Sequence, residues 1–271
     1  MGTAKQQGAA RRAQTKNTAG GHAKLAKKGP VPMAATSTAA ARLHAIYAAL
    51  LDAYGPQHWW PAETDFEMIV GAYLTQATSW RSVERSLNNL RSAGLLHLDG
   101  VRNTRPPVLH TMVRPSGFMQ RKVRSIRAFV RFLDTQYQGS LDVARKQHTD
   151  ALRKQLLSLP GVGPETADSI LLYAMGHRAV VVDEYFRRVA SRHGLLRHTG
   201  RGKEQDAELR ALATAALRSR VHATELEDAK ELHALIVEVG KRHCGPTAHC
   251  KGCPLEKFLP RNAGQRPGQD V

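Results

Sequence analysis

The feature that most constrains the fold is a short block rich in glycine and proline at residues 159–168, Leu-Pro-Gly-Val-Gly-Pro-Glu-Thr-Ala-Asp. An amphipathic helix is predicted before it, and Pro160 should end that helix because proline restricts its own backbone and that of its neighbour. Gly161 and Gly163 permit a tight turn, and Pro164 suits the first turn of a new helix. The block therefore predicts two helices joined by a tight hairpin.

The rest of the chain, from Ala39 onward, also shows apolar residues at helical spacing. Helices are predicted over residues 64–77, 80–93, 105–114, 118–136, 149–158, 164–175, 184–193, 204–218 and 227–242. No sustained alternation of apolar and polar residues indicates strands, and the apolar run 179–182 is too isolated to found a sheet. The predicted fold class is all-α.

Charge indicates the kind of partner. The chain of 271 residues has 40 Lys and Arg against 23 Asp and Glu, a formal net charge of +17. Such a surplus favours a polyanionic partner, with nucleic acid as the first candidate. The alternative is that the chain is a basic ribosome-associated protein or merely a soluble basic protein. No apolar run reaches the length of a membrane span, and no secretory segment begins the chain. We therefore expect a cytoplasmic protein, associated with the nucleoid of a bacterial-type cell, and no membrane partner.

The two ends of the chain differ from its middle. Residues 1–38 carry basic residues but no acidic or aromatic ones, so they cannot bury enough apolar surface to offset the entropy of ordering. We predict a disordered basic arm that adds salt-sensitive affinity for DNA. Its composition is also compatible with an organelle transit peptide. Residues 261–271 are predicted to form a flexible tail.

The hairpin has a direct use in a basic protein. Its backbone amides lie at the start of a helix, where they can bind an anion such as a DNA phosphate. We expect the DNA contacts to come from Gly161, Val162, Gly163 and Thr166. The alternative is an ordinary helix corner closed by a glycine cap. The complete block is more specific than such a corner, because it resembles the helix-hairpin-helix motif of the endonuclease III superfamily of DNA glycosylases.

That resemblance extends over about residues 40–258 and implies a two-lobed helical fold. One lobe, roughly residues 62–180, would be a helical barrel that ends in the hairpin. The other would combine residues 39–61 with residues 181–260. The lesion pocket would lie between them.

Asp183 is the candidate catalytic residue. It directly follows the apolar run Val-Val-Val and precedes a predicted helix, so it is a natural N-cap. In the resembled superfamily an aspartate in this context, after the hairpin, lies at the lesion pocket, and Asp183 matches it. A carboxylate kept ionised by the helix N-terminus can stabilise the positive charge that develops on the sugar as an N-glycosidic bond breaks. It can also activate the attacking water.

Glu165 indicates which reaction the chain performs. Bifunctional members of the superfamily, which also nick the DNA strand, carry a lysine at this place in the hairpin block. An imine requires an amine, which a carboxylate cannot supply. The resemblance therefore implies a monofunctional enzyme without lyase activity. Lys154 or Lys241 could substitute in principle, although nothing in the sequence favours either.

Aromatic residues gather in one window of the chain. His-Trp-Trp-Pro at residues 58–61 and Trp80 contain all three tryptophans. They could pack in a core, or they could stack on a flipped base, with extra attraction for an alkylated, cationic one. Residues 66–80 resemble a segment of endonuclease III relatives in which a glutamine, here Gln76, fills the gap left by the flipped nucleotide. Trp59, Trp60, Pro61, Trp80 and Glu165 match the base pocket of a narrower branch, the bacterial 3-methyladenine DNA glycosylases.

Three cysteines, Cys244, Cys250 and Cys253, are clustered near the end of the chain. Their loop resembles the iron–sulfur loop of endonuclease III relatives, where a fourth cysteine stands at the position of Leu259. A [4Fe–4S] cluster takes four thiolates, so His243, His249 or an outside ligand would have to complete it. A Cys₃His zinc site and a loop that binds no metal are the alternatives.

These features together predict a monomeric base-excision-repair glycosylase acting on double-stranded DNA that contains a damaged base. The damaged base is expected to be an alkylated purine such as 3-methyladenine. Two alternatives differ from this prediction. One is an endonuclease III-like glycosylase with AP lyase activity on oxidised pyrimidines. The other is a DNA-binding module without catalysis, which would not need Asp183.

Overall fold

The computed structural model describes residues 33–197, 202–219 and 221–260. The predicted arm lies outside the described residues as far as residue 32, and so does the predicted tail. The described segments contain helices and no strand; one isolated antiparallel bridge joins Cys244 and Ala248. The all-α prediction is therefore confirmed. No helix of these segments is long and apolar enough to cross a membrane.

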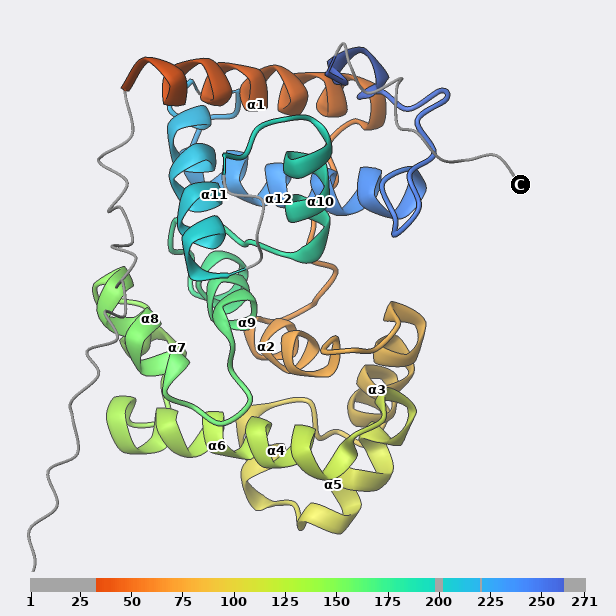
Figure 1. The fold of residues 1–271 in the computed structure, drawn as a ribbon. Coiled ribbons are helices and arrows are strands. Elements are labelled where there is room, and N and C mark those ends of the chain that lie inside the picture. Colours follow the sequence, from red (N-terminus) through yellow and green to blue (C-terminus); the bar gives the residue numbers. More distant parts are fainter. Residues whose placement is uncertain (1–32, 198–201, 220, 261–271) are drawn as a thin grey trace, which may run out of the picture. The chain divides into compact units, whose positions relative to one another are not determined.

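The helices form two groups (Figure 1). In the first, α2 (Asp65–Leu74) packs against α3 (Trp80–Ser92), α6 (Met119–Tyr137) and a π-helix, η2 (Ile170–Ala174). The remaining members of this group are α4 (Leu98–Asn103), α5 (Pro106–Val113), η1 (Arg114–Ser116), α7 (Leu141–Ala144), α8 (Thr149–Leu157) and α9 (Pro164–Ser169). α9 continues into η2, so the two together cover residues 164–174 of the predicted helix 164–175.

The second group is built around α12 (Glu225–Arg242). It contains α1 (Met33–Tyr54), which packs on α11 (Lys203–Ala216) and α12, and α10 (Glu184–Arg192), which packs on α12. A short 3₁₀ turn, η3 (Glu256–Phe258), follows the cysteine loop. α12 also contacts η2, and this contact joins the two groups into one compact unit. The bounds predicted for the two lobes remain a prediction.

Most predicted helices are present within a few residues of their expected ends, and the differences have local causes. α1 begins at Met33, so it includes residues 33–38, which the sequence assigned to the basic arm. α4 and α7 are too short for a periodic apolar pattern to reveal. α12 begins at Glu225, two residues before its predicted start, because Thr224 and Glu227 form a reciprocal capping box.

Candidate active site

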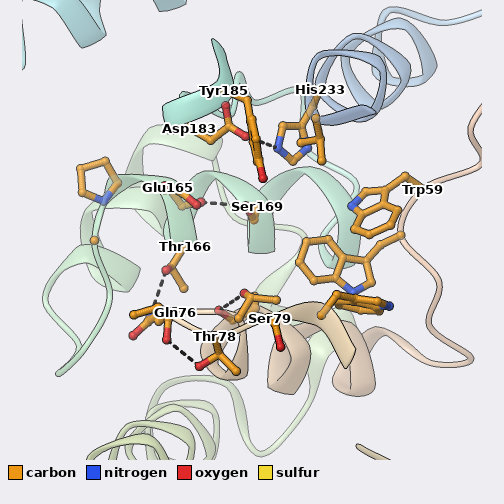
Figure 2. Close-up of a pocket in the computed structure, with 18 of the residues that line it drawn as sticks. Trp59, Gln76, Thr78, Ser79, Glu165, Thr166, Ser169, Asp183, Tyr185 and His233 are labelled. Atoms are coloured by element: carbon orange, nitrogen blue, oxygen red, sulfur yellow. Dashed lines mark hydrogen bonds and ion pairs between the residues drawn. The ribbon is translucent and has the colours of Figure 1, made fainter. Parts of the chain in front are cut away.

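A cleft of about 840 Å³ is lined by residues of both helix groups. Asp183, Glu165, His233 and the three tryptophans all line it, although they are far apart in the sequence (Figure 2). The cleft therefore brings together the carboxylates and the aromatic residues that the sequence singled out. Clefts that combine apolar walls with a few converging polar groups are where ligands bind.

Asp183 caps α10, as predicted. Its Oδ1 accepts a hydrogen bond of 2.7 Å from the backbone N–H of Phe186, and its backbone is extended rather than helical. The residue is only 6% exposed. The cap fixes one carboxylate oxygen at a helix N-terminus, where positive dipole charge favours an anion. The second oxygen, Oδ2, lies 3.7 Å from Nε2 of His233.

His233, on α12, is a site residue that the sequence did not reveal. Its Nδ1 lies 2.7 Å from the hydroxyl of Tyr173, which is in the π-helix. Tyr173 in turn contacts Trp60 edge-on, with ring centroids 5.7 Å apart. A continuous chain of contacts therefore connects the aromatic wall of the cleft to the carboxylate of Asp183. Tyr173 and His233 are 60 positions apart in the sequence, so no local pattern could have indicated their contact.

The three tryptophans form one aromatic wall. Trp59 and Trp60 are joined by a cis peptide bond, and the ring centroids of the three pairs lie 5.2 to 5.7 Å apart. The indole N–H groups of Trp59 and Trp60 are buried and have no acceptor among the described residues. Trp80 donates its N–H to Glu84 at 2.7 Å. Pro61, predicted for the same pocket, is exposed and is not among the residues that line the cleft.

The loop that carries Trp59 and Trp60 is held by Glu231 of α12. The two carboxylate oxygens of Glu231 accept hydrogen bonds from the backbone N–H groups of Gln57, at 2.7 Å, and His58, at 2.9 Å. Glu231 is 7% exposed, and a bond to a charged acceptor is stronger when water is excluded. α12 therefore positions the aromatic wall as well as His233.

Lys241, near the end of α12, lies against the same wall. Its ammonium is 5.1 Å from the centroid of the Trp59 ring, a cation–π contact, and it lines the cleft. One face of Trp59 is therefore already covered by a positive charge. Lys154, the other lysine considered from the sequence, does not line the cleft.

The hairpin lies at the cleft edge, and it adopts the predicted turn. Gly161 has a φ of +78°, and a Cβ at this position would lie 2.4 Å from Oγ of Ser125, so only glycine fits both the backbone and the close contact. Gly161, Gly163 and Pro164 are exposed, whereas the side chain of Val162 is buried. The exposed backbone agrees with the predicted role of the hairpin, and the DNA contacts themselves remain a prediction.

Gln76 is bound to the hairpin. Its side-chain N–H group donates to the carbonyl of Gly161 at 2.8 Å and to Oγ1 of Thr166 at 3.0 Å. Thr166, predicted to contact DNA, is 8% exposed and faces this amide. To fill a gap in a DNA stack, Gln76 would have to release both bonds.

A buried lysine holds the segment around Gln76. Nζ of Lys122, which is 2% exposed, donates to the carbonyls of Leu74 and Ser116 and to Oγ1 of Thr78 at 2.6 to 2.8 Å. Burial lowers the pKa of Lys122 to about 8, and neighbouring Arg121 acts in the same direction. Three acceptors compensate for the removal of the ammonium from water. Lys122 therefore ties the loop after α2 to the start of α6.

Glu165 occupies the hairpin position discussed above and reaches into the cleft (Figure 2). Its side chain is accessible from the cleft, yet the surrounding protein removes much of its water, and this desolvation raises its pKa. The negative charge of Asp183 raises it further, while His233 and Arg187 oppose the shift. The carboxyl group of Glu165 is thus pushed toward its protonated, neutral form.

The cysteine loop does not match a four-thiolate site. Cys244, Cys250 and Cys253 surround a cavity of about 20 Å³, room for about one water molecule, and Leu259 lines it where a fourth thiolate would be needed. Sγ of Cys244 accepts a hydrogen bond of 3.1 Å from Arg192, which also donates to the carbonyls of Gly245 and Pro246. No group of three or more His, Cys, Asp or Glu among the described residues is arranged to hold a metal. The residues present therefore do not fit a [4Fe–4S] cluster.

Known proteins of DNA repair are similar to this chain. The family model for the HhH-GPD superfamily base excision DNA repair protein matches residues 70–214. MJ1434 of Methanocaldococcus jannaschii, named as a DNA repair glycosylase, is 41% identical over 217 residues, which cover 80% of this chain and 94% of that protein. Endonuclease III of Thermotoga maritima is 26% identical over 196 residues, covering 72% of this chain and 82% of that protein.

Solved structures show the same fold. H. pylori 3-methyladenine DNA glycosylase (MagIII), bound to 1,N6-ethenoadenine, is 27% identical and has a TM-score of 0.63, covering 74% of this chain and 97% of that one. Both the fold and the family resemblance predicted from the sequence are therefore confirmed. With a family model that matches more than half of its residues, the chain belongs to the HhH-GPD superfamily of base excision DNA repair proteins.

Proposed function

We propose that this DNA glycosylase of base excision repair is monofunctional and excises alkylated purines such as 3-methyladenine from double-stranded DNA. The observation that carries the proposal is the cleft that the capped carboxylate of Asp183 shares with three packed tryptophans. The tryptophans offer aromatic faces to a base turned out of the helix. Asp183 stabilises positive charge on the sugar and accepts a proton from the attacking water.

The most direct test is release of methylated bases. DNA treated with a methylating agent is incubated with the protein, and free 3-methyladenine and 7-methylguanine are separated by chromatography and counted. We expect release that depends on Asp183, as developed in the Discussion. A duplex with thymine glycol serves as the comparison, because preferential release of that oxidised pyrimidine would instead favour an endonuclease III-like enzyme.

The absence of lyase chemistry is a separate prediction. With Glu165 at the hairpin position, we expect no covalent enzyme–DNA adduct when the reaction is quenched with borohydride, and an intact strand until alkali is added. Lys241 is the lysine among the residues that line the cleft, so an adduct that disappeared in Lys241→Ala would identify it as the amine. Such an adduct would contradict the monofunctional assignment but not the glycosylase activity.

An exposed aromatic residue supports the binding of DNA at this face. Phe118 is 66% exposed and caps α6 with a left-handed backbone, φ +46°, a conformation that is strained for an aromatic residue. Arg121, which lines the cleft, lies 5.9 Å from the Phe118 ring centroid. Apolar side chains held out in this way can insert between bases and help to kink a duplex. We propose that Phe118 enters the DNA beside the flipped nucleotide.

This gives a prediction for binding. Phe118→Ala is expected to weaken the affinity for a duplex with an abasic-site analogue about 10-fold, because one stacking contact with a base is worth ~1–3 kcal/mol. Fluorescence anisotropy measures the change. Val108→Ala, which shortens another exposed apolar side chain that is not part of the cleft, should bind like the wild type. Equal affinity of the wild type and Phe118→Ala would refute the proposed insertion.

A further inference from the structure

His233 is placed to exchange a proton with Asp183. Its side chain is 9% exposed and lines the cleft, and Nε2 lies 3.7 Å from Oδ2 of Asp183 (Figure 2). The other ring nitrogen, Nδ1, lies 2.7 Å from the hydroxyl of Tyr173. One nitrogen is therefore occupied by a protein partner, and the other faces the catalytic carboxylate and the space for the base.

Tyr173 contacts the other nitrogen of the ring. When its hydroxyl donates to the carbonyl of Lys230, at 3.2 Å, it accepts a hydrogen bond from Nδ1–H of His233. Burial raises the pKa of Tyr173 well above its usual value, and the charges of Glu231 and Asp183 add to this, so the phenol keeps its proton. With Nδ1–H given to Tyr173, the hydrogen that His233 can pass to a base is the one on Nε2.

Only some of the modified purines that could enter this cleft need a proton donor in order to leave. A purine alkylated on a ring nitrogen, such as 7-methylguanine, is cationic and leaves as a neutral molecule. A neutral modified purine, such as hypoxanthine or 1,N6-ethenoadenine, would leave as an anion unless a ring nitrogen is protonated. General acid catalysis of that proton transfer typically accelerates a reaction by ~10²–10⁴-fold.

Resting on the proposed glycosylase function, we propose that His233 is the general acid that lets this site excise neutral modified purines as well as alkylated, cationic ones. The C1′–N bond breaks and its electrons go to the base, which takes the Nε2 proton of His233. Water adds to C1′ and gives a proton to Asp183. That proton then passes from Asp183 to Nε2, across the 3.7 Å separation, which restores both residues.

Two further features of the cleft favour His233 in this role. Lys241 already covers one face of Trp59, so this face is not free to attract a cationic base. Glu165 is the other candidate acid, because desolvation raises its pKa. However, no hydrogen bond or ion pair among the described residues holds the carboxyl group of Glu165. Each ring nitrogen of His233, in contrast, has a neighbour: Nδ1 lies beside Tyr173 and Nε2 beside Asp183.

The experiment compares two variants on two kinds of lesion. Single-turnover excision is measured for the wild type, His233→Gln and Glu165→Gln on duplexes with 7-methylguanine, hypoxanthine or 1,N6-ethenoadenine. We expect His233→Gln to slow release of the neutral bases about 10²-fold more than release of 7-methylguanine. Glu165→Gln should change both by similar factors. Thermal unfolding and duplex binding check that the variants fold, and His233→Asn serves as a second substitution.

The outcomes separate this proposal from the proposed function. A wild type that releases none of the bases contradicts the proposed excision of alkylated purines. A wild type that releases 7-methylguanine but no neutral purine overturns the role of His233, and so does an equal loss on both lesion types in His233→Gln. A selective loss in Glu165→Gln would assign the proton to Glu165 instead.

Discussion

Replacement of Asp183 by asparagine is expected to slow base excision about 10³-fold or more while the fold and the affinity for DNA remain. Loss of one preorganised electrostatic group, or of a general base, costs this order of rate. Asparagine is itself a good N-cap, so it can keep the bond to the N–H of Phe186, whose partner is Oδ1 of Asp183. What disappears is the negative charge beside the sugar. Single-turnover release of 7-methylguanine, with enzyme in excess, measures the effect.

The neighbouring acid provides a matched control. Glu184 follows Asp183 directly in α10 but does not line the cleft, and it pairs with Arg188 at 3.5 Å. Glu184→Gln removes a charge of the same sign at the next residue of the chain, so its excision rate should stay within a few-fold of the wild type. If Asp183→Asn turns over like Glu184→Gln while both bind DNA normally, the catalytic assignment of Asp183 is wrong.

The sequence predicted those parts of the site that depend only on residues adjacent in the chain. The hairpin needs glycine at a left-handed position and proline at a helix start, and both requirements are local. The cap at Asp183 is likewise set by an apolar run followed by a helix. These features indicated the hairpin and the cap from neighbouring residues alone. The catalytic role of Asp183 came from the resemblance and stays a prediction. The three tryptophans were identified for the same reason, since they stand within one short window.

The parts that the sequence did not predict depend on contacts across the fold. His233, Tyr173 and Glu231 each look like an ordinary helix residue, and only the packing of α12 on η2 and on the loop before α2 gives them partners. Pro61 was assigned to the pocket by resemblance, but the backbone turns it to the surface. The inward position of Thr166 also follows from a tertiary contact, its bond to Gln76.

The largest stability effect is expected at Asp228, at the start of α12. This residue is fully buried, and its carboxylate accepts hydrogen bonds from Tyr47, from the backbone N–H groups of Val221 and His222, and from the His222 ring. Burial alone would raise the pKa of Asp228, but the bonds from His222, Tyr47 and the two amides outweigh it, so its pKa is lowered. The carboxylate therefore links α12 to α1, through Tyr47, and to the loop that precedes α12, through Val221 and His222.

Asp228→Asn is expected to lower the free energy of unfolding by about 3 kcal/mol at pH 7, because an amide brings an N–H group against buried donors. Thermal unfolding measures it, as a decrease in Tm of roughly 6–12 °C for a domain of this size. Asp99→Asn, at an exposed acid, should change the free energy by no more than about 0.5 kcal/mol.

The pH dependence of this difference tests its cause. A carboxyl group whose pKa is lower in the folded state stabilises the fold fully above its unfolded pKa of about 3.9, and the contribution is lost as pH falls below that value. The gap in Tm between the wild type and Asp228→Asn should therefore be constant near neutral pH and shrink below about pH 4. A gap that stays the same at low pH would mean that packing, rather than the ionised carboxylate, holds α12 in place. Since α12 carries both His233 and Glu231, loss of this anchor should also lower the temperature at which excision stops.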